Sequence, residues 1–296
     1  MQIPFTKFSK FYYIFSGLLI LGAVVSIIIF GLRFGIELTG GSMLELEFDQ
    51  RPENAAIQDK LKGLNLGEII VQPTGERGMI LRLKDIDEIS HQEILKNLQD
   101  LSPVKELRFE SIGPTIGKEI KQKTMIAIIL ALLAITFYIA IAFRKISRPV
   151  ASWRYGIASL IALFHDILIP LGIFAVLGKF YNIEITIPII AALLTILGYS
   201  VHDTIVIFDR IRENILKRGL KSFEETVNWS LNQTLGRSIS TVLTVLIDLF
   251  AIFFFGGSTL KYFALVLIIG ITSGAYSSIF IASPLLVTWA RTRKLI

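Results

Sequence analysis

The stretch ITIPIIAALLTILGYSVHDTIVIF, residues 185–208, decides the class of fold. It is apolar over nearly its whole length, and a helix of this length rises far enough, at about 1.5 Å per residue, to cross a hydrocarbon core of roughly 30 Å. Similar runs recur along the chain of 296 residues, 53% of which are hydrophobic. We therefore predict an α-helical polytopic membrane protein with six transmembrane helices, at Phe11–Leu32, Thr124–Phe143, Val150–Val176, Ile185–Phe208, Arg237–Phe255 and Tyr262–Trp289.

The charged residues predict the orientation of these spans. Residues 37–121 hold 16 acidic and 11 basic side chains, whereas the rest of the chain holds 8 acidic and 19 basic ones. Those cations gather beside alternate span ends, which is the positive-inside bias, and it predicts that both termini are cytoplasmic. Three tryptophans lie near the same ends, as interfacial anchors do: Trp153, Trp229 and Trp289. Because membrane topology accounts for the net charge of +6, we expect no nucleic-acid partner.

Two further features limit the possible classes. The first apolar run is longer than the core of a signal peptide and no small-residue cleavage site follows it, so we expect it to be a retained span. The chain contains no cysteine, which excludes disulfides and thiolate metal sites.

A polar insertion separates the first two spans. We predict three regions: residues 1–33 with the first span, an extracytoplasmic domain at 34–122, and residues 123–296 with the other five spans. Alternation of apolar and polar residues predicts strands at 43–48 and 104–112, and a Pro/Gly turn separates two short strands at 68–72 and 78–84. Helical spacing marks 53–64 and 90–101, the latter opened by a capping box of Ser90 and Glu93.

The resulting order, βαββαβ, is that of a ferredoxin-like domain. Such a domain offers a sheet face and strand edges for binding, and no residue pattern in it is typical of catalysis. We interpret His91, beside the predicted helix cap, as a solvated side chain.

Ionisable residues within the spans are the candidate functional groups, since a charge at the bilayer centre costs about 2.5–3.5 kcal/mol. They are His165, Asp166, His202, Asp203, Arg237 and Asp248.

Two of them are expected at similar depth. Asp203 lies six residues before Asp209, where its span meets the cytoplasm, and Arg237 lies six residues into its helix if that helix begins near Leu231. In antiparallel neighbours the two side chains could pair, which lowers the cost of burying either. The pair is either a static structural ion pair or a site where Asp203 exchanges its proton and releases Arg237.

The remaining candidates also have two interpretations each. Asp166, one turn before a helix-kinking Pro170, is either an ion-coupling carboxylate or a buried one bonded to neighbouring Ser or Thr hydroxyls. His165 and His202 extend a proton path or line a polar seam, and we favour the seam. Asp248 reaches the membrane interface.

Close helix packing is indicated by Gly270 and Gly274, a small-xxx-small pair. That face serves either this bundle or a partner subunit.

Several blocks of sequence resemble the bacterial SecF family of protein-export membrane proteins. They include GIELTGGSMLEL (35–46), SIGPTIGKEI (111–120), ALFHDILI (162–169), GYSVHDTIVIFDRIREN (198–214), LNQTLGRSISTVLTV (231–245) and FGGSTLKYFALVLIIGITSGAYSSIFIASPLL (255–286), in that order along nearly the whole chain.

The resemblance implies half of an RND-type bundle in the bacterial inner membrane that joins a SecD-like subunit. With a SecYEG-type channel it would use the proton or sodium gradient to assist translocation of an unfolded preprotein, without enzymatic activity or a cofactor. The family's functional acid and arginine fall on Asp203 and Arg237, and its His-Asp pair falls on His165 and Asp166.

This chain departs from the family pattern at three positions. Glu37 stands where Asp is usual, His202 stands where a smaller polar residue is common, and Asp248 matches no signature.

Two other functions agree less well with the sequence. An intramembrane metallohydrolase could use the two His-Asp pairs, but no H-E-x-x-H helix is present. An RND-like exporter of lipids or small hydrophobic molecules is disfavoured by the compact external domain.

Overall fold

The computed structural model describes residues 3–144, 150–218 and 222–292. The chain divides into two compact units. One, the helix bundle, comprises the chain up to residue 32, residues 127–180 and the chain from 188 onward. The other, the sheet domain, comprises residues 33–126 and also 181–187.

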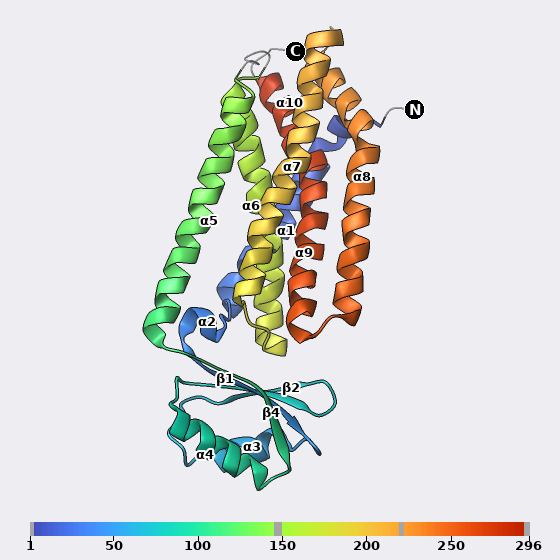
Figure 1. Ribbon diagram of the computed structural model, residues 1–296. Helices are drawn as coiled ribbons and strands as arrows, with labels where there is room; N and C mark the ends of the chain where they lie inside the picture. Colours follow the sequence, from blue (N-terminus) through green and yellow to red (C-terminus); the bar gives the residue numbers. More distant parts are fainter. Residues whose placement is uncertain (1–2, 145–149, 219–221, 293–296) are drawn as a thin grey trace. The chain divides into compact units, whose positions relative to one another are not determined.

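Among the described residues, six helical segments are long and apolar enough to cross a membrane, which confirms the predicted number. They are drawn in Figure 1 and are formed by the short 3-10 turn η1 (Phe5–Phe8) with α1 (Ser9–Phe30), α5 (Pro114–Ala142), α6 (Ser152–Tyr181), α7 (Ile187–Arg218), α8 (Phe223–Phe255), and the consecutive α9 (Ser258–Ser277), η2 (Ser278–Ala282) and α10 (Ser283–Thr292). Pro170 lies within α6.

The fifth span begins earlier than predicted, at Phe223 and not at Arg237 or Leu231. The reason is a cap: the Ser222 side chain accepts a hydrogen bond from the backbone N–H of Glu225 at 3.1 Å. Polar residues on the first turns of α8 masked this start, because hydropathy alone locates only the apolar part of a helix. Arg237 consequently lies well inside α8.

Three spans form the interior of the helix bundle. In the most apolar part of each, 44% of the residues of α6, 44% of those of α7 and 61% of those of the α9–α10 span are buried, against 11% in α1, 6% in α5 and 11% in α8. An aromatic group packs in this interior, where the Tyr155 ring lies 5.3 Å from Phe143 and 5.1 Å from Phe208. Several polar side chains of these spans are therefore buried in protein, among them Asp166, Ser200 and Ser277.

The sheet domain has the predicted βαββαβ order (Figure 1). It contains the short helix α2 (Ile36–Thr39), then β1 (Gly41–Phe48), α3 (Asn54–Leu61), β2 (Ile70–Thr74), β3 (Gly78–Leu83), α4 (Glu88–Gln99) and β4 (Val104–Ile112). The strand order is β2-β3-β1-β4, and every neighbouring pair is antiparallel. Alternate residues of β1 and β3 face the two helices and form the core with them.

Two predictions in this domain are wrong. Helix α4 begins at Glu88, and its cap is Asp87, whose carboxylate accepts from the backbone N–H of Ser90 at 3.0 Å. His91 is 4% exposed, stacked on Phe109 with ring centroids 3.9 Å apart. A polar side chain on the inner face of an amphipathic helix is buried when partners are available, and here both ring nitrogens have one: Nδ1 lies 3.2 Å from Glu88 and Nε2 lies 3.0 Å from Glu106.

The connection between α6 and α7 joins the sheet domain, which the sequence did not predict. Ile185 donates its N–H to the carbonyl of Arg33 at 2.7 Å and accepts from the N–H of Gly35 at 3.0 Å. These bonds make a short parallel bridge between Phe34 and Ile185.

Candidate functional site

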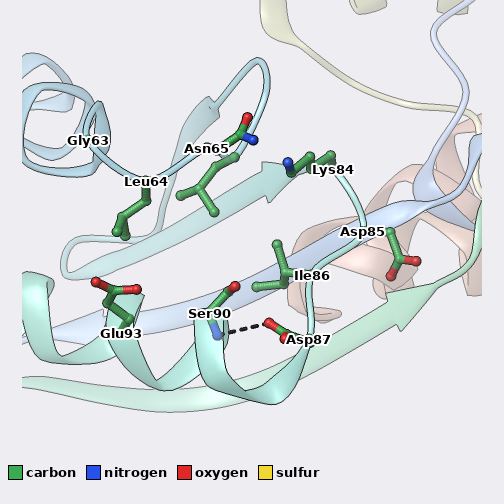
Figure 2. Close-up of a pocket in the computed structure, with 10 residues that line it drawn as sticks. Gly63, Leu64, Asn65, Lys84, Asp85, Ile86, Asp87, Ser90 and Glu93 are labelled. Carbon is green, nitrogen blue, oxygen red and sulfur yellow. Dashed lines mark hydrogen bonds between the residues drawn. The ribbon is translucent and has the colours of Figure 1, made fainter.

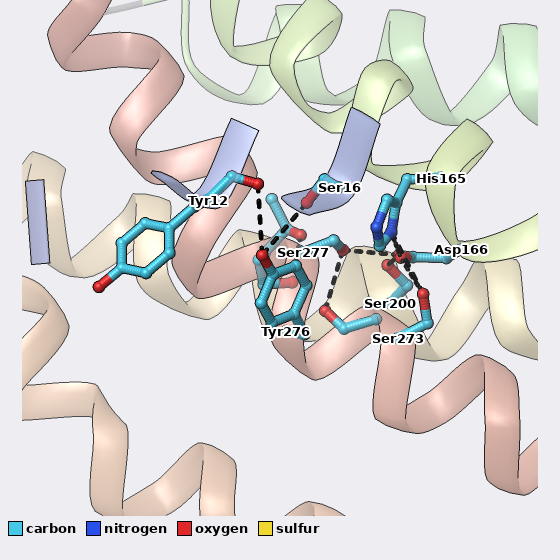
Figure 3. A network of polar contacts seen from close by, with 11 residues as sticks. Tyr12, Ser16, His165, Asp166, Ser200, Ser273, Tyr276 and Ser277 are labelled. Atoms are coloured by element: carbon cyan, nitrogen blue, oxygen red, sulfur yellow. Dashed lines mark hydrogen bonds and ion pairs between the residues drawn. The ribbon is translucent and has the colours of Figure 1, made fainter. Parts of the chain in front are cut away.

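The polar centre of the bundle is Asp166, a carboxylate on α6 that is 0% exposed. Four donors reach it (Figure 3). Its Oδ1 accepts from His165 Nδ1 at 2.9 Å and Ser273 Oγ at 3.1 Å, and its Oδ2 accepts from Ser200 Oγ at 2.5 Å and Ser277 Oγ at 2.7 Å. Since Ser200 is on α7 and the other two serines are on α9, this carboxylate links three helices.

The glycine pair on α9 faces α7 and allows this arrangement. A Cβ at Gly270 would overlap the side chain of Ile196, and one at Gly274 would meet Ser200 Cβ at 3.0 Å. The two contacts are one helical turn apart on both helices, so the backbones approach closely along this line. Ser200 is thereby brought within hydrogen-bond reach of Asp166.

One turn further along the contact between α7 and the α9–α10 span lie a pair of hydroxyl groups and an irregular helical turn. Thr204 Oγ1 on α7 and Ser278 Oγ lie 2.7 Å apart. Ser278 opens η2, a π-helical turn, where the backbone leaves the regular i to i−4 pattern. Short π-helical turns inside α-helices occur frequently at functional sites.

His165 connects the Asp166 centre to α1. Its ring stacks on Tyr276, with centroids 5.9 Å apart, and the Tyr276 hydroxyl accepts from Ser16 Oγ at 3.2 Å (Figure 3). His165 Nε2 is buried and has no hydrogen-bond partner among the described residues. Whether His165 lines a polar seam or extends a proton path stays a prediction.

Asp203 is in a different environment on α7. It is half-buried, and its Oδ1 accepts a hydrogen bond from Ser238 Oγ of α8 at 2.6 Å. Its Oδ2 is buried and has no partner among the described residues. The bond to Ser238 places Asp203 at the level of the residue that follows Arg237, which is the similarity of depth predicted from the sequence.

The other predicted site residues lie on the surface of the bundle. The Arg237 side chain is exposed, and no ion pair within the described part of the chain joins it to Asp203. His202 and Asp248 are exposed as well. The Asp203–Arg237 interaction thus remains a prediction.

Sequence reasoning missed the hydroxyl donors, which are Ser200, Thr204, Ser238, Ser273, Ser277 and Ser278. The sequence does contain a pattern that indicates some of them. Ser200 and Thr204 are four residues apart in an apolar run, as are Ser273 and Ser277, so each pair lies on one helix face. The described residues include no group of three or more His, Cys, Asp or Glu side chains that could hold a metal ion.

The sheet domain has a polar pocket of its own (Figure 2). It lies between residues 63–66, residues 84–87 and the start of α4, where Ser90 and Glu93 line it. Its Asp87 carboxyl caps α4, and the bond from Ser90 lowers the pKa of Asp87. Asp87 and Ser90 of this pocket therefore have a structural role at the start of α4.

Comparison with known proteins identifies the family. The model for the protein export membrane protein SecD/SecF, C-terminal region, matches residues 91–292, and the SecD/SecF GG motif matches residues 25–50. The protein translocase subunit SecF of Thermobaculum terrenum is 44% identical, over 97% of this chain and 94% of the relative. The SecF subunit of Rhodothermus marinus is 39% identical, over 96% of this chain and 92% of the relative.

Solved structures give the same result. The crystal structure of SecDF, a translocon-associated membrane protein from Thermus thermophilus, is 33% identical with a TM-score of 0.86. The match covers 98% of this chain but 39% of that longer one. A structure of SecDF in a super-membrane-facing form gives a TM-score of 0.71 at the same identity, again covering 39% of that chain. The chain therefore belongs to the SecF family of protein translocase subunits.

Proposed function

We propose that this multi-pass membrane protein is an energy-coupling subunit of a protein translocase. It joins a SecD-like subunit and acts with a SecYEG-type channel in the bacterial inner membrane, where it uses the proton or sodium gradient to assist preprotein translocation. The named SecF relatives and the longer SecDF chain, described as translocon-associated, support this function over a lipid exporter or a metallohydrolase. No chemical step is assigned to the protein.

The observation that carries the proposal is the state of Asp203. Among the residues that the structure describes, one of its carboxylate oxygens is buried without a partner, and the other has a single bond, to Ser238. A carboxylate so sparsely bonded within a span can gain or lose a proton with little rearrangement. Moving one elementary charge across 100 mV makes about 2.3 kcal/mol available, which is enough to shift a conformational equilibrium.

Arg237 is the second member of the coupling site. It precedes Ser238, so rotation or sliding of α8 would bring its guanidinium toward Asp203. The pair forms when Asp203 is ionised and separates when Asp203 is protonated. Asp166 belongs to the site as the group that positions α7, because its bond from Ser200 fixes that helix three residues before Asp203.

The orientation is part of the proposal. Thr6 and Arg291 both contact Glu224, at 2.9 and 2.6 Å, which supports placing both chain ends and the start of α8 on one side of the membrane. The basic residues of the bundle gather at these ends, so this side is the cytoplasm. The sheet domain is then extracytoplasmic and contacts the emerging preprotein.

The test is reconstituted translocation with the SecD-like partner and the channel under an imposed ΔpH or ΔpNa. Asp203→Asn should leave the complex assembled and abolish the stimulation by the gradient. Asp248→Asn is the matched control, since it removes an exposed carboxylate from a neighbouring span and should retain the stimulation. Full stimulation with Asp203→Asn would refute the coupling role, and the gradient that stimulates the intact protein identifies the ion.

A further inference from the structure

A second group of charges lies in the sheet domain, around the connection between α6 and α7. Glu184 Oε2 lies 2.8 Å from Arg82 Nε, and the two side chains are only 10% and 13% exposed. Arg82 is on β3 and also donates from Nη1 to Gln72 at 2.7 Å, so the sheet fixes its position. Glu184 lies three residues after α6 ends and three before α7 begins.

Backbone bonds hold the same connection. The pairing of Ile185 with Arg33 and Gly35 adds it to the chain that follows α1, and Arg33 Nη1 donates to the Asn182 side chain. Segment 181–187 is therefore attached to the sheet domain by the backbone of Ile185 and, one residue earlier, by the nearly buried contact of Glu184 with Arg82.

A second carboxylate, from Glu37 of α2, lies at this point. A Cβ at Gly35 would meet both Glu37 Oε2 and, at 3.2 Å, the Thr186 methyl group, so the Glu37 side chain folds back toward the α6–α7 connection. The charged groups that act on Glu184 are accordingly Arg82 from β3, Glu37 from α2 and Arg33 from the chain before it. Two acids and two arginines share one region with little access to water.

We propose that Glu184 is a proton-binding positioning residue: buried against Arg82, it holds the connection between α6 and α7 on the sheet domain, and loss of its proton weakens this clamp because the contact with Arg82 does not fully offset the cost of burying the charge. The biological role of this clamp rests on the proposed function, because α6 carries Asp166 and α7 carries Asp203. Through chain continuity, the clamp restrains the ends of both helices.

The direction of the pH response follows from the surroundings of Glu184. Burial and the nearby Glu37 carboxylate raise the pKa of Glu184 to about 7 against the opposing effect of Arg82. If the segment detaches, Glu184 meets water and its pKa returns toward the ordinary value of about 4.3. Proton binding therefore favours the clamped state, and the clamp weakens as the pH rises through 7.

Hydrogen exchange of the full chain, followed by mass spectrometry on peptides covering residues 181–187 and 33–40, tests this directly. After correction for intrinsic exchange rates, protection in these peptides should be about ten-fold greater at pH 6 than at pH 8, as expected from linkage between those two pKa values. Peptides from β1 and β3, which exchange only when the whole domain unfolds, should be more protected than these two peptides at both pH values, and this difference separates local detachment from global unfolding.

Variants separate Glu184 from its neighbours. Glu184→Gln has no proton to lose, so protection should be the same at both pH values. Glu37→Gln removes a charge that raises the pKa of Glu184 and should move the transition to lower pH, whereas Arg82→Gln should move it to higher pH. Equal protection at pH 6 and 8 in the intact protein, or an unchanged pH response in Glu184→Gln, would overturn the proposal. Because exchange is measured without translocation, this result is independent of the Asp203 test.

Discussion

Replacing Asp166 should destabilise the helix bundle several times more than replacing Asp203, although both are aspartates in transmembrane helices. Asp166 accepts four hydrogen bonds from three helices, and Asp203 accepts one. Asp166→Ala removes the acceptor that all four donors share. Ser200 then keeps no partner among the described residues, whereas Ser277 can donate to the Gly274 carbonyl at 3.1 Å and Ser273 Oγ lies 3.2 Å from His165 Nδ1. Within the described part of the chain, Asp203→Ala leaves only Ser238 without its acceptor.

The magnitude follows from the value of one bond. Hydrogen bonds within membrane proteins average about 0.6 kcal/mol, and bonds to charged groups in proteins contribute about 1.5 kcal/mol or more. Four bonds at Asp166 then correspond to about 2–6 kcal/mol, and one bond at Asp203 to about 0.6–1.5 kcal/mol. Each substitution also removes the cost of burying a charge, which partly offsets the lost hydrogen bonds. We therefore expect the decrease in the free energy of unfolding to lie toward the lower end of each range.

The assay is unfolding of the purified protein in mixed micelles with increasing SDS, followed by circular dichroism. Asp166→Asn keeps the volume and should lie between Asp166→Ala and the intact protein, because the amide retains one acceptor oxygen while the serine hydroxyls can turn to accept from its nitrogen. If Asp203→Ala lowers the free energy of unfolding as much as Asp166→Ala does, the bond count does not explain the roles of these two residues.

Three further predictions concern packing and the sheet domain. Gly270→Ala should lower the unfolding free energy by about 1–3 kcal/mol because the added methyl group overlaps an isoleucine of α7. Gly22→Ala is the control, since Gly22 has open space around it and the substitution should not lower the unfolding free energy; the same SDS titration compares the two variants. His91→Ala should lower the melting temperature of the sheet domain, since it removes the stack on Phe109 and two hydrogen bonds worth together about 2–4 kcal/mol. The pKa of Glu184 is raised to about 7, so the folded state binds more protons than the unfolded state. The contribution of Glu184 to the free energy of unfolding, roughly 3 kcal/mol in all, is therefore fully present below about pH 4 and is lost as the pH rises through 7. Urea unfolding of the sheet domain at pH 5 and pH 8 measures that change, which Glu184→Gln should abolish.

The sequence was sufficient to predict the six spans and the βαββαβ order, because both depend on local pattern. An apolar run of the length of 185–208 has few alternatives to a membrane helix. Alternation in β1 and β4 and the turn between β2 and β3 are also local signals. The start of α8 was missed because its cap, Ser222 with Glu225, precedes the apolar part of the helix.

The environment of each polar residue could not be predicted in the same way. Asp166 and Asp203 each follow a histidine in an apolar helix, and nothing local distinguishes them. What differs is the helix opposite: α9 places two serines against Asp166, and α8 places one against Asp203. The attachment of Ile185 to residues 33–35 is likewise a contact between segments some 150 residues apart.

Under the proposed function, this difference between the two aspartates lets one bundle hold both a structural carboxylate and a coupling carboxylate. A carboxylate with four donors has every acceptor position used by groups on helices that pack closely through Gly270 and Gly274, so altering its charge disturbs three helices at once. A carboxylate that has, among the described residues, one donor and one buried oxygen without a bond disturbs a single contact. Under the proposed coupling role, the Asp166 centre holds α7 in place through Ser200, and the energy of protonation at Asp203 would be directed to α8, the less buried helix that carries Ser238 and Arg237.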